Sequence, residues 1–127
     1  TGFNLSGQRR RNDPPSGLWR GVPWRGRGTY GTNVYLDAAP IDQVLRRLIE
    51  LRVSQINGCH YCIWLHTRQA RDLGETVDRI QAVAEWRAAG CFDEAECAAL
   101  AWTESVTRIS DGVPPDDQSA ALGHTFR

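Results

Sequence analysis

The chain has 127 residues, an apolar content of 41% and a formal net charge of zero, values that are typical of one globular domain. Its apolar runs are only a few residues long, far below the roughly 20 residues that a membrane-spanning helix needs. No apolar run follows the N-terminal arginines, as a secretory signal would require. These features exclude a membrane-spanning protein, give no support to export and predict a cytoplasmic location.

The first part of the chain is basic. Residues 1–30 hold six arginines and one acid, Asp13, and are rich in glycine, proline and serine without a helical or alternating apolar period. We therefore expect residues 1–34 to be a disordered or loosely ordered leader and residues 35–127 to form the folded domain. Binding of this leader to a nucleic acid is unfavoured, because no folded nucleic-acid module accompanies it.

The apolar spacing after the leader predicts two helices. Pro40 suits an early helical position, and apolar residues follow at helical spacings. They are Val44, Leu45, Leu48, Ile49 and Ile56. The pattern predicts an amphipathic helix over roughly 40–56, which ends at Asn57-Gly58 because glycine tolerates left-handed geometry. A second helix is expected from about Cys59 to Leu73, before Gly74.

Two further helices are predicted towards the C-terminus. One begins near Thr76 and ends before Gly90. The next opens with Asp93 as N-cap and Glu96 three residues later, in a capping-box arrangement, and continues to Asp111-Gly112. After Pro114-Pro115 only one or two helical turns are expected. The fold class is therefore all-α, a small helical bundle.

The motif Cys59-His60-Tyr61-Cys62, with His66 one helical turn later, carries the most chemistry. The thiolate is the reactive form of cysteine. Cys59 lies at a predicted helix N-terminus, which favours negative charge, and His66 shares a face with Cys62 and can take its proton. Once one sulfur is oxidised to a sulfenic acid, the other can close a disulfide. The helix terminus favours Cys59 as the attacking sulfur and the histidine favours Cys62, so these arguments leave the order open.

Two other interpretations fit these residues. Cys59, Cys62, His66 and Cys91 make an acceptable tetrahedral ligand set for a structural zinc ion. Alternatively, the chain is a non-catalytic helical interaction or regulatory domain. Outside the zinc interpretation, Cys91 and Cys97 fit packing or loop positions, because isolated cysteines often serve as small apolar residues.

The sequence resembles a known family at several places. These are the run Leu51 to Cys62 with His66, the segment Arg68 to Gly74, Glu85-Trp86-Arg87, and Ala98 to Glu104. They resemble the carboxymuconolactone decarboxylase-like superfamily, and within it the alkylhydroperoxidase D-like branch with its C-x-x-C-x-x-x-H motif. The resemblance covers residues 35–126. It implies an all-helical antioxidant protein that reduces hydroperoxides or disulfides without a metal or organic cofactor. Branches that decarboxylate a lactone generally lack the cysteine pair, which argues against that reaction.

The resemblance also implies a role for each site residue. Cys62 would attack the peroxide, Cys59 would resolve the product to a disulfide, and His66 would relay protons. The family's relay glutamate sits twelve residues before the first motif cysteine, where this chain has Arg47. Glu50, one helical turn later, is the candidate replacement.

The resemblance leaves both ends of the chain unmatched. Residues 1 to about 32 are expected to have no counterpart in the family, and the family's last helix is expected to be missing. Because the sequence also lacks methionine, we expect a fragment or a processed product. A core of about 75 ordered residues is small for independent stability, which predicts a homo-oligomer. The expected partners are a small hydroperoxide and a dithiol reductant.

Overall fold

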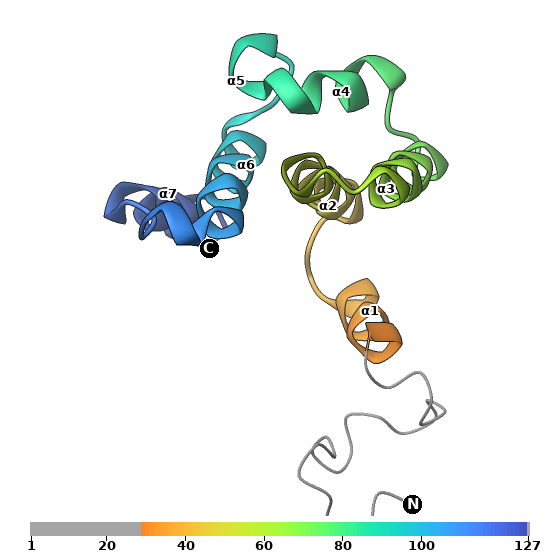
Figure 1. Cartoon of the computed structure of the whole chain (residues 1–127), viewed down its shortest axis with the longest axis horizontal. Helices are drawn as coiled ribbons and strands as arrows, with labels where there is room; N and C mark the ends of the chain where they lie inside the picture. Colours follow the sequence, from red (N-terminus) through yellow and green to blue (C-terminus); the bar gives the residue numbers. More distant parts are fainter. Residues whose placement is uncertain (1–28, 127) are drawn as a thin grey trace, which may run out of the picture. The chain divides into compact units, whose positions relative to one another are not determined.

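The computed structural model describes residues 29–126. The chain divides into two compact units, residues 1–40 and 41–127. The described residues form helices and no strand (Figure 1), which confirms the predicted all-α class. None of their helices combines the length and the apolar composition that a bilayer crossing requires.

Helix α1, Thr29–Ala38, belongs to the first unit. Residues 29–34, expected to belong to the leader, lie in this helix instead. The likeness to a leader arises because Thr29, Gly31 and Asn33 all have low helix propensity. Residues 1–28, the rest of the predicted leader, lie outside the described residues.

Helices α2, Gln43–Asn57, and α3, His60–Asp72, lie side by side (Figure 1). Pro40 was expected inside the first turn of α2. The helix instead begins after Asp42, because the Asp42 carboxylate accepts the backbone N–H of Leu45 at 2.8 Å and so acts as the N-cap. At the other end Gly58 has a φ of +65°, and the Cys59 N–H donates to the Ser54 carbonyl at 3.1 Å. This closing turn places Cys59 directly at the start of α3.

Three shorter elements replace the single helix expected after Thr76. They are α4 (Val77–Ala82), the 3-10 turn η2 (Val83–Glu85) and α5 (Trp86–Ala89). The first of them starts next to Thr76, as predicted, and Thr76 is its N-cap, since the Thr76 hydroxyl accepts the Arg79 N–H at 3.3 Å. Gly90, with a φ of +68°, ends α5 as predicted.

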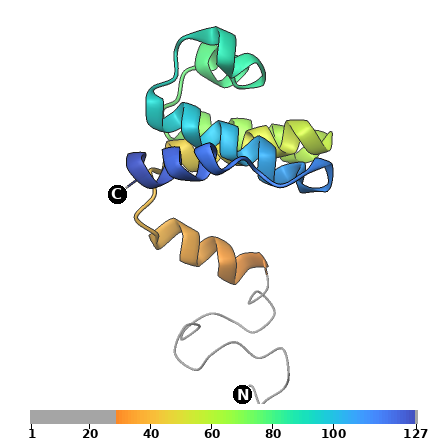
Figure 2. The ribbon, with the colours of Figure 1, turned by 90° about the vertical axis from the view of Figure 1, so that its left-hand side faces the viewer.

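The C-terminal part begins with α6, Glu94–Thr107. The predicted capping box is present: Asp93 accepts the Glu96 N–H at 2.8 Å, and the Glu96 carboxylate accepts the Asp93 N–H at 2.9 Å. A 3-10 turn, η3 (Ile109–Asp111), continues the chain where the sequence predicted unbroken helix. Helix α7, Asp116–Thr125, packs on α6 (Figure 2) and is longer than the one or two turns expected.

The core of the second unit is built around α2. Its buried apolar side chains come from every element between α2 and α6. They are Leu48, Leu51, Ala70, Ile80, Val83, Trp86 and Leu100. Leu48, Leu51 and Leu100 are at most 1% exposed, and burial of each contributes about 2 kcal/mol. Helices α3 and α6 both pack on α2, one on each side of it (Figure 1). Side chains of α2 therefore contact both of the polar clusters described below.

Candidate active site

Cys59 and Cys62 meet at the N-terminus of α3. They are joined as a disulfide, with their Cα atoms 5.3 Å apart, within the usual range for such bonds. Cys59 is the N-cap residue and takes an extended conformation, so its sulfur accepts the backbone N–H of Cys62 at 3.3 Å. Both side chains are partly exposed. The structure therefore brings together the two sulfurs that the sequence singled out, at a helix N-terminus, where the helix dipole favours negative charge.

His66 lies one turn beyond Cys62 on α3, and its ring contacts α2. The Nδ1 atom of His66 is 3.1 Å from Oε2 of Glu50 and 2.9 Å from Oε1 of Gln69. The side chains of His66 and Glu50 are 19% and 22% exposed, so the contact is shielded without being sealed from water. Glu50, the candidate replacement for the family's relay glutamate, is thus in contact with the candidate relay histidine.

Two arginines hold the Glu50 carboxylate. Arg46 Nε donates to one oxygen at 2.9 Å, and Arg47 Nη1 donates to the other at 2.7 Å. Arg47 occupies the position where the family has its glutamate, and it contacts the same oxygen that faces His66. At residue 47 this chain therefore has an arginine where the family has a glutamate. That arginine binds the carboxylate of Glu50, one helical turn later.

The structure does not group the four residues of the zinc interpretation as metal ligands. Within residues 29–126, no three side chains of histidine, cysteine, aspartate or glutamate are grouped so that they could hold a metal ion. Cys91 is exposed and Cys97 is partly buried. Burial, followed by the negative charges of Glu96 and Asp93, raises the pKa of the Cys97 thiol. Because a raised pKa disfavours the thiolate, Cys97 suits the packing role expected from the sequence.

A second carboxylate cluster was not predicted as a site. Glu104 on α6 accepts Arg52 Nε of α2 at 2.8 Å, Trp86 Nε1 of α5 at 3.0 Å and Arg87 Nη1 at 2.6 Å. Burial acts to raise the pKa of Glu104, but the hydrogen bonds from Trp86, Arg87 and Arg52 outweigh it and lower that pKa. Glu85-Trp86-Arg87 and Ala98 to Glu104 carried part of the family resemblance, and this contact shows that the two matched segments meet in space.

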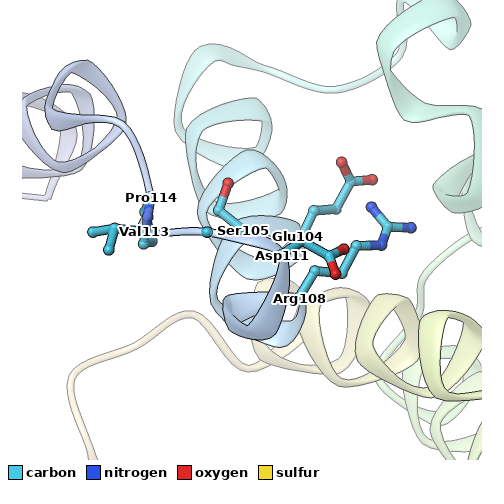
Figure 3. Close-up of a pocket in the computed structure, with 7 residues that line it drawn as sticks. Glu104, Ser105, Arg108, Asp111, Val113 and Pro114 are labelled. Carbon is cyan, nitrogen blue, oxygen red and sulfur yellow. The ribbon is translucent and has the colours of Figure 1, made fainter.

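A pocket of about 260 Å³ opens beside this second cluster (Figure 3). Figure 3 shows Glu104 on α6 and Arg108 just after its end, with Val113 and Pro114 on the loop that follows η3. None of Glu50, Cys59, Cys62 and His66 lines it. The pocket is therefore separate from the cysteine pair.

Gln69 and Arg46 are two contacts of the candidate site that the sequence analysis missed. Gln69 follows His66 by three residues on one helix, a spacing that brings side chains together, so that signal was available. Arg46 precedes Glu50 by four residues, the spacing of a helical ion pair.

Two curated bacterial proteins are similar to this chain. The uncharacterized protein YdfG of Bacillus subtilis (strain 168) is 40% identical over 83 residues, which cover 65% of this chain and 56% of YdfG. The uncharacterized protein YnjA of Escherichia coli (strain K12) is 29% identical over 69 residues, which cover 54% of this chain and 38% of YnjA. The chain thus spans about half the length, or less, of these curated relatives.

A solved structure also matches. The Agrobacterium tumefaciens protein ATU0492, a protein of unknown function assigned provisionally to antioxidant defence as AhpD, superposes with a TM-score of 0.76. It is 30% identical, and the match covers 82% of this chain and 71% of that one.

The carboxymuconolactone decarboxylase family model matches residues 25–105. The match begins inside the stretch that was expected to have no counterpart in the family, so that expectation was wrong for residues 25–32. Since the matched residues make up more than half of the sequence, the chain belongs to the carboxymuconolactone decarboxylase family.

Proposed function

We propose that this protein is a thiol-dependent peroxidase or disulfide reductase of antioxidant defence, with Cys59 and Cys62 as its redox pair. One observation carries the proposal: the two sulfurs lie close enough to bond at a helix N-terminus, while a histidine backed by a carboxylate stands one turn away on the same helix. Family membership and the provisional antioxidant assignment of the Agrobacterium protein agree with it.

The catalytic cycle has three steps. The Cys62 thiolate attacks the terminal oxygen of a hydroperoxide, the O–O bond breaks, and the alkoxide leaves as an alcohol after taking a proton. The Cys59 sulfur then attacks Cys62, so that the S–S bond forms and the sulfenic oxygen leaves as water. An external dithiol reduces the disulfide by two electrons and is itself oxidised to a disulfide.

His66 and Glu50 supply the proton movements of this cycle. His66 takes the Cys62 proton and returns it to the leaving alkoxide, the usual work of a general acid and base. Glu50 stabilises the ring while it carries the extra proton, because its Oε2 faces Nδ1 at 3.1 Å. The Glu50 contact also weakens the reason for regarding the chain as a non-catalytic relative, since that interpretation rested in part on Arg47 standing in the glutamate position.

The test is consumption of an organic hydroperoxide in the presence of a dithiol. We expect Cys62→Ser to reduce the rate to background and Cys59→Ser to stop turnover after the first oxidation. Cys91→Ser is the matched control, because Cys91 is an exposed cysteine outside the pair, and it should keep the wild-type rate. Equal rates for Cys62→Ser and wild type would remove the proposal.

The proposal extends to assembly and location. Several large apolar side chains on α3 and after it are about half exposed or more, among them Tyr61, Trp64 and Ile109. Covering them in a homo-oligomer would remove this apolar surface from water, and light scattering at micromolar concentration should give a mass above that of one chain. A cycle that consumes an external dithiol also suits the reducing cytoplasm.

A further inference from the structure

The two ring nitrogens of His66 have different surroundings. Nδ1 is 3.1 Å from Glu50 Oε2 and 2.9 Å from Gln69 Oε1. An ionised carboxylate has no proton to donate and can only accept a hydrogen bond. Glu50 is held by the guanidinium groups of Arg46 and Arg47, so the hydrogen on this contact must belong to Nδ1.

The proton on Nδ1 determines what the other nitrogen can do. In a neutral imidazole with Nδ1 protonated, Nε2 carries the lone pair. No hydrogen bond joins Nε2 to another residue in the part of the chain that the structure describes. Nε2 is therefore the nitrogen that remains available to exchange a proton.

Gln69 and Glu50 reach the ring from different helices. Gln69 lies three residues after His66 on α3, whereas Glu50 lies on α2. A single acceptor would leave the ring free to turn about its own side-chain bonds, since the terminal torsion of histidine is broad. Two acceptors on one nitrogen, from two packed helices, restrict the plane of the ring as well as its tautomer.

We propose that Gln69 is a positioning residue for His66, holding the ring with Nδ1–H towards Glu50 and Gln69 so that Nε2 exchanges the proton of Cys62. This inference rests on the proposed function. In the cycle, Nε2 would accept the thiol proton as the thiolate forms and donate it to the alkoxide as the O–O bond breaks, which returns the ring to its starting form. Gln69 itself would contact neither peroxide nor sulfur.

The first arm of the test is spectroscopic. Nitrogen NMR of the reduced protein labelled at histidine reports which ring nitrogen carries the proton, and His66→Asn identifies the His66 signals among those of the three histidines. Wild type should show the Nδ1–H form, and Gln69→Leu should show mixed tautomers or a broadened ring signal. A predominant Nε2–H form in wild type would overturn the inference whether or not the protein reduces peroxides.

The second arm is kinetic. Gln69→Leu should lower the rate of peroxide-driven disulfide formation about fivefold, as expected when a general base is misplaced. Gln69→Glu keeps an acceptor oxygen and should restore most of the rate, while Gln81→Leu, a glutamine exposed on α4, should leave it unchanged. If wild type reacts and Gln69→Leu keeps both its rate and its ring signals, the positioning role fails. It also fails if Gln69→Glu restores nothing. An unreactive wild type would instead defeat the proposed function, and the spectrum would still decide the tautomer.

Discussion

Two glutamates in this protein are each surrounded by arginines, but their remaining partners differ. Glu104 is 8% exposed and binds Arg52, Arg87 and the Trp86 ring N–H. Glu50 is 22% exposed and binds Arg46, Arg47 and His66. Arginine and tryptophan keep their protons at any physiological pH, whereas a histidine ring can serve as a general acid or base.

Glu104 therefore has the partners of a structural carboxylate, whereas Glu50 has the partner that the proposed relay needs. The Glu104 cluster joins α2, α5 and α6 through donors that never titrate, so its effect should appear in stability. The Glu50 cluster includes His66, the histidine of the proposed proton relay. Its effect should appear in the rate of thiol oxidation.

The largest expected effect is on stability, from Glu104→Gln. The amide keeps the shape of the side chain but removes the charge that two guanidinium groups and an indole N–H share. Breaking a buried ion pair in this way should cost about 3 kcal/mol and lower the Tm by roughly 15 °C, measured by thermal unfolding. Glu85→Gln, an exposed control, should be neutral. A Tm for Glu104→Gln within a few degrees of wild type would show that the cluster is not a stabilising contact.

Glu50→Gln should affect the rate of thiol oxidation more than the stability of the fold. The amide no longer stabilises a charged His66 ring, so we expect the rate of peroxide-driven oxidation to fall about tenfold. Because Glu50 is more exposed than Glu104, the Tm should change much less than in Glu104→Gln. Stopped-flow oxidation and thermal unfolding of the same samples would check both halves. A large fall in the Tm of Glu50→Gln with an unchanged oxidation rate would contradict the proposal, because Glu50 would then be a structural residue.

Acid should weaken the Glu104 cluster. The pKa of Glu104 is lowered from its ordinary value of 4.5 in the folded state, since its hydrogen bonds outweigh the effect of burial. A lowered folded pKa adds stability above the unfolded value, and that stability is lost as the pH falls below about 4.5 towards the folded pKa. Urea unfolding between pH 7 and pH 3 should therefore show a fall that is smaller in Glu104→Gln. Parallel curves for the two proteins would contradict the assignment.

The smallest effect is expected from Arg87→Ala. Arg87 donates to Glu104 and stacks on the Trp86 ring at 4.1 Å, but its side chain is 60% exposed. Exposed ion pairs contribute little, so the cost should stay near 0.5 kcal/mol. Arg52→Ala removes a donor that is only 14% exposed and should cost clearly more. Equal losses of stability in Arg87→Ala and Arg52→Ala would mean that the exposure of a donor does not determine how much it stabilises the fold.

Local signals in the sequence predicted much of the fold. The Asp93 and Glu96 pair predicted the capping box, and Gly58 predicted the end of α2, because both depend on residues only a few positions apart. Helix α1 was missed because several of its residues have low helix propensity. The break at η2 was also missed, since the residues around Val83 carry no local sign of a change in helix type.

The part of the candidate site that lies along a single helix could be predicted from the sequence. Cys62 and His66 lie on α3 and Cys59 is its N-cap, so their spacing along the sequence was enough to group them. The Glu50 contact depends on how α2 packs against α3, which made it a candidate only through the resemblance. The Glu104 cluster joins residues 52 positions apart, and no helical period reports such a contact.

The most direct test is peptide mass spectrometry of the reduced protein, before and after one equivalent of an organic hydroperoxide, with alkylation of free thiols and trypsin digestion. Cleavage after Arg52 and Arg68 leaves Cys59 and Cys62 in one peptide, and Cys91 and Cys97 fall together in another. We predict that peroxide removes two hydrogens from the first peptide and blocks its alkylation, while the second stays fully alkylated. If the first peptide keeps two alkylated thiols, or if both peptides oxidise at the same rate, Cys59 and Cys62 are not the redox pair of this protein.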